Sequence, residues 1–183
     1  AFAAARYHDR AGLIIVTDRV ERFIPARSGR NHAVHLIHEV IHHQPVSSGS
    51  DLRPALHEIL PRLRRMASVF IISDFQVPDF SRELTLLKHR HEVSAIRITD
   101  ERESDLPDVG LIELEDAETG EQILIDTSDQ AFRDEYRRVV VAAERQIIEM
   151  LGRSRVRVET IRTDEDWIIP LRHLFSPGFA GGM

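Results

Sequence analysis

The stretch S-V-F-I-I-S-D, residues 68–74, determines the fold class that this sequence predicts. Four consecutive large apolar residues, Val69 to Ile72, stand between two serines without any polar alternation. Such a run is typical of a strand buried on both faces of a parallel sheet that helices cover. An acid at the carboxyl end of such a strand lies at the sheet edge where open α/β folds bind their ligands. Asp74 is therefore the first candidate functional residue.

Length and composition predict a globular chain. With 183 residues and 42% apolar side chains, we expect one domain over residues 1–183, with a flexible tail at 176–183. The absence of cysteine excludes disulfides, thiolate metal sites and a cysteine nucleophile. No apolar run reaches the roughly 20 residues that span a bilayer, and the first residues do not form a signal peptide. We therefore expect a soluble, cytoplasmic chain without membrane contact.

The charged residues exclude further classes of site. Lys88 is the only lysine among 24 basic residues, and it does not follow a glycine. A P-loop is therefore excluded, because it needs a Gly-Lys pair on the phosphates. The net charge of −6, without a basic stripe, argues against a nucleic-acid partner.

The first third of the chain is predicted to form a hairpin followed by two helices. Residues 13–17 make an apolar strand, and R-F-I-P-A-R at 22–27 returns as an edge strand that tolerates Pro25. Ser50 or Asp51 is expected to cap the second helix, which Pro61 kinks or ends. The first helix, at 31–43, is predicted to bury Ala33, Val34, Ile37, Val40 and Ile41.

Helices and strands alternate in the rest of the chain. Ser81 is expected to cap a helix to about His91, and the strand at 93–99 is expected near the sheet edge. L-I-E-L-E at 111–115 and E-Q-I-L-I-D at 121–126 predict a hairpin that turns at Gly120. A last strand is expected at 156–161. The longest helix opens at T-S-D-Q, residues 127–130, and is predicted to bury Phe132, Tyr136, Val139, Val140, Ala143, Ile147 and Leu151.

H-E-V-I-H at residues 38–42 matches the zinc-peptidase pattern H-E-x-x-H. In such enzymes two histidines one helical turn apart bind zinc, and the glutamate is the general base. His38, Glu39 and His42 are therefore candidate residues of a metalloenzyme. However, Pro45 ends the helix soon afterwards, no third ligand follows at the metzincin spacing, and the chain contains 10 histidines. A polar helix face is the alternative interpretation of the same residues.

Oxygen-bearing side chains follow several of the predicted strands. If the strands at Leu13, Val69, Val93 and Val156 run parallel, their carboxyl ends share one rim, which we expect to carry Asp18, Ser48, Ser50, Asp51, Asp74, Asp100 and Asp164. Hydroxyls and carboxylates suit Mg²⁺, Mn²⁺ or Ca²⁺ rather than zinc. The alternative is structural, because Ser50 and Asp51 can cap a helix and Asp74 can cap the loop after its strand.

Several motifs resemble known families. G-S-D-L-R-P-A-L at 49–56 resembles G-T-x-L-x-x-A-L of von Willebrand factor A domains, and F-I-I-S-D at 70–74 resembles their strand ending in a metal-site aspartate. The runs at 106–121, D-T-S-D at 126–129 and T-D-E-D-W-I-I-P-L at 163–171 are similar to a bacterial family called domain of unknown function 58. This resemblance covers nearly the whole chain.

The resemblance implies a metal-ion-dependent adhesion site. It makes Ser50 the counterpart of the metal-site threonine and Asp74 that of the third-loop aspartate, with Ser48 and Asp51 beside Ser50. The principal motif, D-x-S-x-S, has no counterpart and would lie before Ala1. The resemblance thus implies an N-terminally truncated chain without the first, central strand of the domain. Two oxygen donors would leave Mg²⁺ or Mn²⁺ mostly hydrated and weakly held.

The expected fold is a three-layer α/β domain of the von Willebrand A type, with a mostly parallel Rossmann-type sheet, an antiparallel edge hairpin and an extra β-hairpin. The expected function is protein recognition without catalysis, in which a partner's carboxylate completes the shell of the metal. An unpaired sheet edge also favours a homodimer. The alternatives are a zinc peptidase and a Mg²⁺-dependent phosphate-handling enzyme on the same rim.

The resemblance also implies a partner. Members of the family are often encoded beside MoxR-type AAA+ ATPases, so that such an ATPase is the expected partner. Full-length members commonly carry membrane helices before the domain, which implies membrane anchoring through segments upstream of this chain.

Overall fold

The computed structural model describes residues 6–100, 106–115 and 122–175. The chain forms two compact units, Ala1–Arg62 and Leu63–Met183. The predicted turn at Gly120 and the predicted flexible tail at 176–183 lie outside the described residues. The single-domain organisation stays a prediction.

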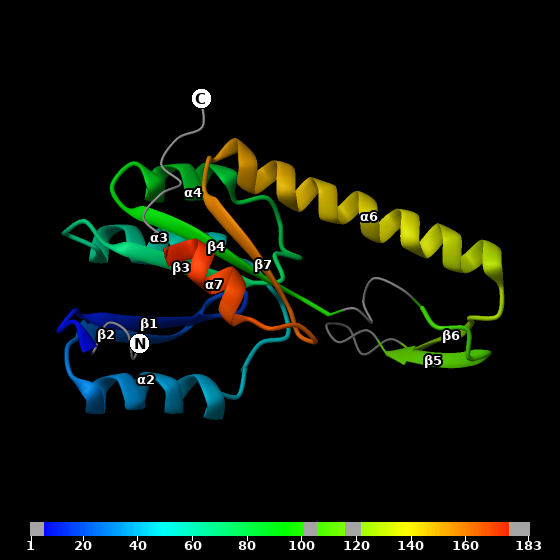
Figure 1. Ribbon diagram of the computed structural model, residues 1–183, viewed down its shortest axis with the longest axis horizontal. Coiled ribbons are helices and arrows are strands. Elements are labelled where there is room, and N and C mark those ends of the chain that lie inside the picture. The colour runs from blue at the N-terminus through cyan, green and yellow to red at the C-terminus, as the bar shows by residue number, and fades with distance from the viewer. Residues whose placement is uncertain (1–5, 101–105, 116–121, 176–183) are drawn as a thin grey trace. The chain divides into compact units, whose positions relative to one another are not determined.

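The first unit contains a β-hairpin and two helices. β1 (Ala11–Val16) and β2 (Val20–Arg27) pair antiparallel, with Leu13 opposite Ile24, which confirms the predicted hairpin. Glycine is required at position 12, because a Cβ there would lie 2.9 Å from the carbonyl oxygen of Ile24. α2 (Arg30–His42) packs against β1, as Figure 1 shows, and α3 (Arg53–Arg62) packs against β2.

The two helices differ in how well the sequence predicted them. α3 ends at Arg62, directly after Pro61, as expected for a residue that lacks an amide donor. In α2, Ala33 and Leu36 are buried, and the predicted apolar stripe is wrong because three of its members are exposed, namely Val34, Val40 and Ile41. A helix that rests on a two-stranded ribbon buries only a narrow strip of its surface.

A three-stranded parallel sheet forms the centre of the second unit. β3 (Ser68–Ser73), β4 (Glu92–Thr99) and β7 (Arg157–Arg162) lie in the order β3-β4-β7. The prediction that the strand at 93–99 lies near the edge is therefore wrong, because β4 is the central strand and buries Val93 and Ala95. Its weak alternation reflects burial on both faces, since the consecutive residues Ala95 and Ile96 are both buried.

β3 is less buried than the sequence predicted, whereas β4 is more central than predicted. Ile71 is buried, but the side chains of Phe70 and Ile72, which point to the other face, are 40% and 64% exposed. The prediction of burial on both faces is thus wrong for this strand. β3 is an edge strand, and the helices that cover the sheet lie mainly over its neighbours.

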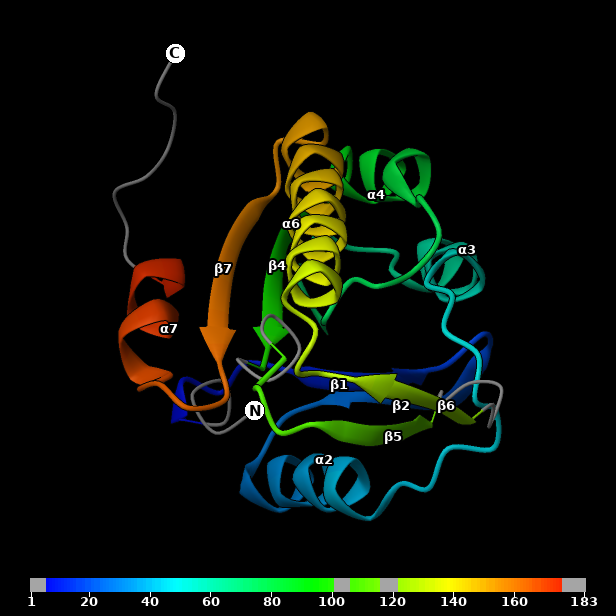
Figure 2. The same cartoon turned by 90° about the vertical axis from the view of Figure 1, so that its right-hand side faces the viewer.

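Helices cover both faces of this sheet, as the predicted three-layer α/β fold requires. α4 (Ser81–Lys88) packs against β4 and against α6 (Gln130–Arg153), whereas α7 (Ile168–Phe175) packs against β7. Figure 2 shows α7 and the α4–α6 pair on opposite sides of β4 and β7. The ring of Phe175 approaches that of Phe70, with 5.3 Å between the centroids.

The ends and faces of these helices correct two predictions. Ser81 does not cap α4, because the N-cap position is Phe80, and Oδ1 of Asp79 just before it accepts a hydrogen bond of 2.8 Å from the amide of Ser81. In α6 the buried residues are Ile147, Met150 and Leu151, whereas Val139 is exposed. The first half of α6 extends past the sheet (Figure 1), so that the apolar spacing there has nothing in the sheet to pack against.

A second hairpin lies at the start of α6. β5 (Leu111–Glu115) and β6 (Gln122–Asp126) pair antiparallel, as predicted. Buried Thr127 closes its base, because its hydroxyl donates to the carbonyl of Gly110 at 2.7 Å and accepts from the amide of Val109 at 3.1 Å. Among the described residues, no helix is both long enough and apolar enough to cross a membrane.

Candidate functional site

Asp74 follows β3 directly, as the sequence predicted, and it is exposed. Its Oδ1 accepts hydrogen bonds from the amide of Gln76 at 3.1 Å and from the hydroxyl of Ser73 at 3.3 Å. No described residue donates to its Oδ2. Half of the carboxylate therefore shapes the local turn, and the other half is available to solvent or to a ligand.

The loop after Asp74 is held by a buried aromatic ring. Phe75 adopts a φ of 63°, which is rare for a residue with a side chain, and is almost completely buried. Its amide donates to Ser73 Oγ at 2.9 Å, and its ring stacks against that of Phe80. Backbone strain of this kind persists only where the surrounding structure imposes it. The loop that carries Asp74 is thus held mainly by this buried ring, and the two hydrogen bonds of the carboxylate add less.

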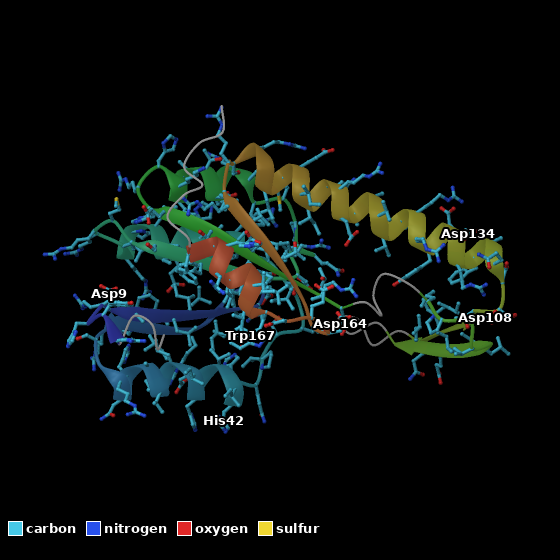
Figure 3. All side chains as sticks on the ribbon, in the orientation of Figure 1. Asp9, His42, Asp108, Asp134, Asp164 and Trp167 are labelled. Atoms are coloured by element: carbon cyan, nitrogen blue, oxygen red, sulfur yellow. The ribbon has the colours of Figure 1, made fainter. Side chains whose placement is uncertain are left out.

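Three aspartates lie at the same edge of the parallel sheet. Asp74, Asp100 and Asp164 follow β3, β4 and β7, and parallel strands end at one edge, where Figure 3 labels Asp164. Two of them are engaged. Asp100 accepts from the hydroxyl of Thr163 at 2.9 Å, and Asp164 forms an ion pair of 2.9 Å with Arg162. Asp74 accepts hydrogen bonds as well, but both come from its own turn and reach one oxygen only.

The other predicted metal ligands lie in one loop of the first unit. Asp51 caps α3, because its Oδ1 accepts from the amide of Arg53 at 2.8 Å, and the Arg53 guanidinium approaches Oδ2 to 2.7 Å. This pairing with Arg53 lowers the pKa of Asp51. Ser48 and Ser50 are exposed. Asp51 therefore has the capping role that the sequence offered as its alternative.

The structure brings the predicted ligands together only in part. Ser48, Ser50 and Asp51 share a loop of the first unit, and Asp74 belongs to the second unit. Among the described residues, no group of three or more His, Cys, Asp or Glu side chains could hold a metal ion. The shared oxygen site of Ser50 and Asp74 stays a prediction.

Asp18, which the sequence placed on the same rim, is fully engaged. The Arg19 guanidinium binds both oxygens of its carboxylate, at 2.9 and 3.1 Å. Hydrogen bonds from Arg19, and next from Ser47, lower the pKa of Asp18 to about 2. This carboxylate holds a turn and has little capacity left for a ligand.

Glu21 was missed by the sequence and is the most highly coordinated acid of the first unit. Its side chain is only 3% exposed and accepts hydrogen bonds from His43 Nε2 at 2.6 Å, from Thr17 Oγ1 at 2.9 Å, and from the amides of Val46 and Ser47 at 2.9 and 3.1 Å. Burial alone would raise its pKa, but the donors, His43 first, lower the pKa to about 2.

Glu21 fixes the segment between α2 and α3, which carries Ser48, Ser50 and Asp51. A sequence signal for it exists, because Glu21 stands two residues before Phe23, the spacing of one strand face, although the register of β2 is irregular at Glu21. A buried acid on such a face needs several donors.

The H-E-V-I-H residues lie on α2 as predicted, but the glutamate is occupied. Arg22 binds Glu39 through two hydrogen bonds of 2.9 and 3.3 Å, and this contact lowers the pKa of Glu39. A carboxylate held by a guanidinium is a poor general base. His38 and His42 are both exposed, and their rings stack with 4.0 Å between the centroids.

A comparison with solved structures supports the fold. The crystal structure of the conserved hypothetical protein BatB from Bacteroides thetaiotaomicron is similar with a TM-score of 0.54. The similarity covers 91% of this chain and 76% of that protein, at 11% sequence identity. At this identity the likeness shows the fold alone.

Sequence relatives come from mycobacteria. An uncharacterized protein of Mycobacterium avium is 35% identical over 148 residues, which cover 79% of this chain and 87% of that protein. An uncharacterized protein of Mycobacterium tuberculosis is 32% identical over 164 residues, 87% of this chain and 51% of that protein. A relative in Mycobacterium bovis matches to the same extent. The chain thus spans about half the length of the last two relatives.

The family is shown by a match over most of the chain. Residues 1–146 match the family described as "Protein of unknown function DUF58". This confirms the resemblance to domain of unknown function 58, whereas the von Willebrand A-type assignment stays a prediction. The chain belongs to the DUF58 family.

Proposed function

We propose that this chain is a non-enzymatic protein-interaction domain and that its partner is a MoxR-type AAA+ ATPase. The observation that carries the proposal is the arm of the second unit, which consists of β5, β6 and the first half of α6. The arm presents aliphatic side chains to solvent, and its hairpin packs mainly on itself.

The hairpin has one wholly aliphatic face. Leu114 lies opposite Ile123, and Ile112 lies opposite Ile125. Directly paired residues of antiparallel strands share a face, so these four side chains form one patch. Ile123 is 51% exposed, and Leu124 on the other face is 69% exposed. An exposed apolar patch of this kind is typical of a surface that a partner covers. A partner would also stabilise the hairpin, since an isolated two-stranded hairpin is marginally stable.

The part of α6 next to the hairpin adds a charge preference. A shallow hollow on this helix is lined by Asp134, Arg137, Arg138, Val141, Ala142 and Arg145. The lining carries three arginines and one aspartate, and Glu135 beside it pairs with Arg138, so the local excess is one positive charge in a chain whose net charge is −6. An acidic protein surface with an apolar centre would complement the arm.

The geometry of the candidate catalytic groups supports the non-enzymatic assignment. Arg22 occupies the carboxylate of Glu39, so that the peptidase pattern lacks a free base. Asp74 is exposed, and its loop bonds only one of its oxygens. We retain Mg²⁺ at Asp74 as part of the proposal, with the ion bridging to a carboxylate of the partner.

Calorimetric titration of the chain with a purified MoxR-type ATPase from the same genome tests the proposal, with and without Mg²⁺. We expect binding that Ile123→Asp weakens at least about tenfold, because it places a charge in the aliphatic patch. Met66→Asp is the matched control, since Met66 is an apolar residue outside the arm that is even more exposed, at 77% against 51% for Ile123. Light scattering of the free chain detects any homodimer that competes for the patch.

The outcomes separate the parts of the proposal. No binding to the ATPase at micromolar concentration would overturn the choice of partner. Equal losses in Ile123→Asp and Met66→Asp would overturn the choice of surface. Binding that is the same with and without Mg²⁺, and in Asp74→Ala, would remove the ion from the proposal.

A further inference from the structure

Two histidines on α2 are arranged as a chelating pair. His38 and His42 lie one helical turn apart, where side chains on a helix are neighbours. Both are exposed, and their rings are nearly parallel, with 4.0 Å between the centroids and 18° between the planes. Figure 3 shows His42 on the side of α2 that faces away from β1 and β2. Both imidazoles are therefore accessible to a ligand from solvent.

A hydrogen bond determines which nitrogen of His42 is available. Nδ1 of His42 lies 2.9 Å from the carbonyl oxygen of His38. A carbonyl oxygen only accepts, so Nδ1 carries the hydrogen, and Nε2 of the neutral ring keeps its lone pair. Histidines that bind metals usually donate their other ring N–H to a carbonyl or carboxylate in this way. His42 thus has the tautomer of a metal ligand before any metal binds.

The separation of the rings suits one shared ion. A transition metal binds each imidazole nitrogen at about 2.0–2.1 Å, so two nitrogens on one ion lie at most about 4 Å apart. Stacked rings with 4.0 Å between their centroids meet this limit after a modest rotation, which two exposed side chains allow.

The neighbours of the pair decide the class of ion. Glu39 is held by Arg22, so the pair provides two nitrogen ligands and leaves the other positions to water. Imidazole suits Cu²⁺, Ni²⁺ and Zn²⁺, and the general order of affinity places Cu²⁺ highest, whereas Mg²⁺ and Ca²⁺ prefer oxygen. We infer that His38 and His42 form a two-imidazole surface site for Cu²⁺, and more weakly for Ni²⁺ and Zn²⁺.

This site differs in residues and in chemistry from the oxygen site predicted at Ser50 and Asp74. It needs neither a peptidase reaction nor the proposed ATPase partner. A bound ion would cross-link one turn of α2 and stabilise the folded chain by mass action.

Calorimetry with Cu²⁺, Zn²⁺ and Mg²⁺ chlorides on the whole chain tests the inference. We expect one Cu²⁺ per chain, weaker Zn²⁺ binding and no response to Mg²⁺. His38→Ala and His42→Ala should each weaken Cu²⁺ binding by about tenfold or more, since even the loss of an outer partner of a metal ligand costs this much. His89→Ala is the matched control, an exposed histidine without a histidine one turn away.

Electron paramagnetic resonance gives a second measurement that does not depend on affinity. The Cu²⁺ spectrum should show coupling to two imidazole nitrogens in the wild type and in His89→Ala. It should show coupling to one imidazole nitrogen in His38→Ala and in His42→Ala. Cu²⁺ affinity unchanged in His38→Ala and His42→Ala, or coupling to a single nitrogen in the wild type, would overturn the inference.

Discussion

Two loops that follow apolar strands use their acids in opposite ways. In the first unit, Asp18 follows β1 and is bound by Arg19 through both oxygens, and nearby Glu21 accepts four hydrogen bonds. In the second unit, Asp74 follows β3 and accepts only from its own turn. Asp18 and Asp74 have the same position after a strand in the sequence, yet only Asp18 has both carboxylate oxygens bound.

The difference lies in what fixes each region. In the first unit carboxylates do so: Asp18 holds the turn after β1 through Arg19, and the buried carboxylate of Glu21 holds the loop between α2 and α3. The loop after β3 is fixed by the buried ring of Phe75, which stacks on Phe80. An acid that a loop does not need for its shape keeps its capacity for a ligand. Asp74 meets this condition, and Asp18 and Glu21 do not.

The largest effect is expected from Glu21→Ala. The substitution leaves the amides of Val46 and Ser47 and the ring of His43 without their acceptor. The donors of His43 and Ser47 are part-buried, and such donors are costly when unsatisfied. We expect Tm to fall by several degrees and the Val46 and Ser47 amides to lose protection against hydrogen exchange. Scanning calorimetry and exchange followed by NMR measure both.

Glu58→Ala is the control for this comparison. Its carboxylate forms a partly exposed ion pair with Arg62 one turn away on α3, a kind of pair that contributes about 0.3–0.5 kcal/mol. Equal decreases of Tm in the two variants would show that Glu21 does not hold its loop.

A smaller effect on the free energy of unfolding is expected from lowering the pH. The pKa of Glu21 is lowered from 4.5 to about 2, and that of Asp18 from 3.8 to about 2. Between these values the unfolded chain binds more protons than the folded chain, so the free energy of unfolding rises with pH. The contribution of Glu21 is complete above pH 4.5 and is lost as the pH falls towards 2. Urea unfolding across this range should show a shallower pH dependence in Glu21→Gln than in the wild type, and parallel curves would contradict the assignment.

The sequence predicted most of the elements because their signals are local. The strand ending at Asp74, the two hairpins and the end of α3 near Pro61 all follow from apolar runs and proline. Burial was harder to predict, since it depends on which element lies opposite. Val139 fits an apolar helix face, yet it lies where α6 has left the sheet.

The candidate site shows the same limit. The positions of Asp74 and Asp51 at an element boundary could be predicted, because a strand end and a helix cap are local features. The role of Glu21 depends on donors from His43, Val46 and Ser47, which are more than 20 residues away along the chain. No spacing rule connects these residues, so a buried acceptor of this kind becomes visible only in the fold.

The smallest effect on stability is expected from Asp74→Ala. A small loss of stability here would distinguish the loop after β3 from the turn after β1, which carries Asp18. The carboxylate makes two exposed hydrogen bonds of 3.1 and 3.3 Å, and the ring of Phe75 stays buried without it, so the free energy of unfolding should change by no more than about 0.5 kcal/mol. Asp18→Ala is the matched variant and should lower Tm clearly more, because Arg19, Ser47 and Thr17 all lose their acceptor. Chemical denaturation of both variants measures the difference. If Asp74→Ala is as costly as Asp18→Ala, the acid after β3 is structural, and its availability to a metal or a partner is no longer supported.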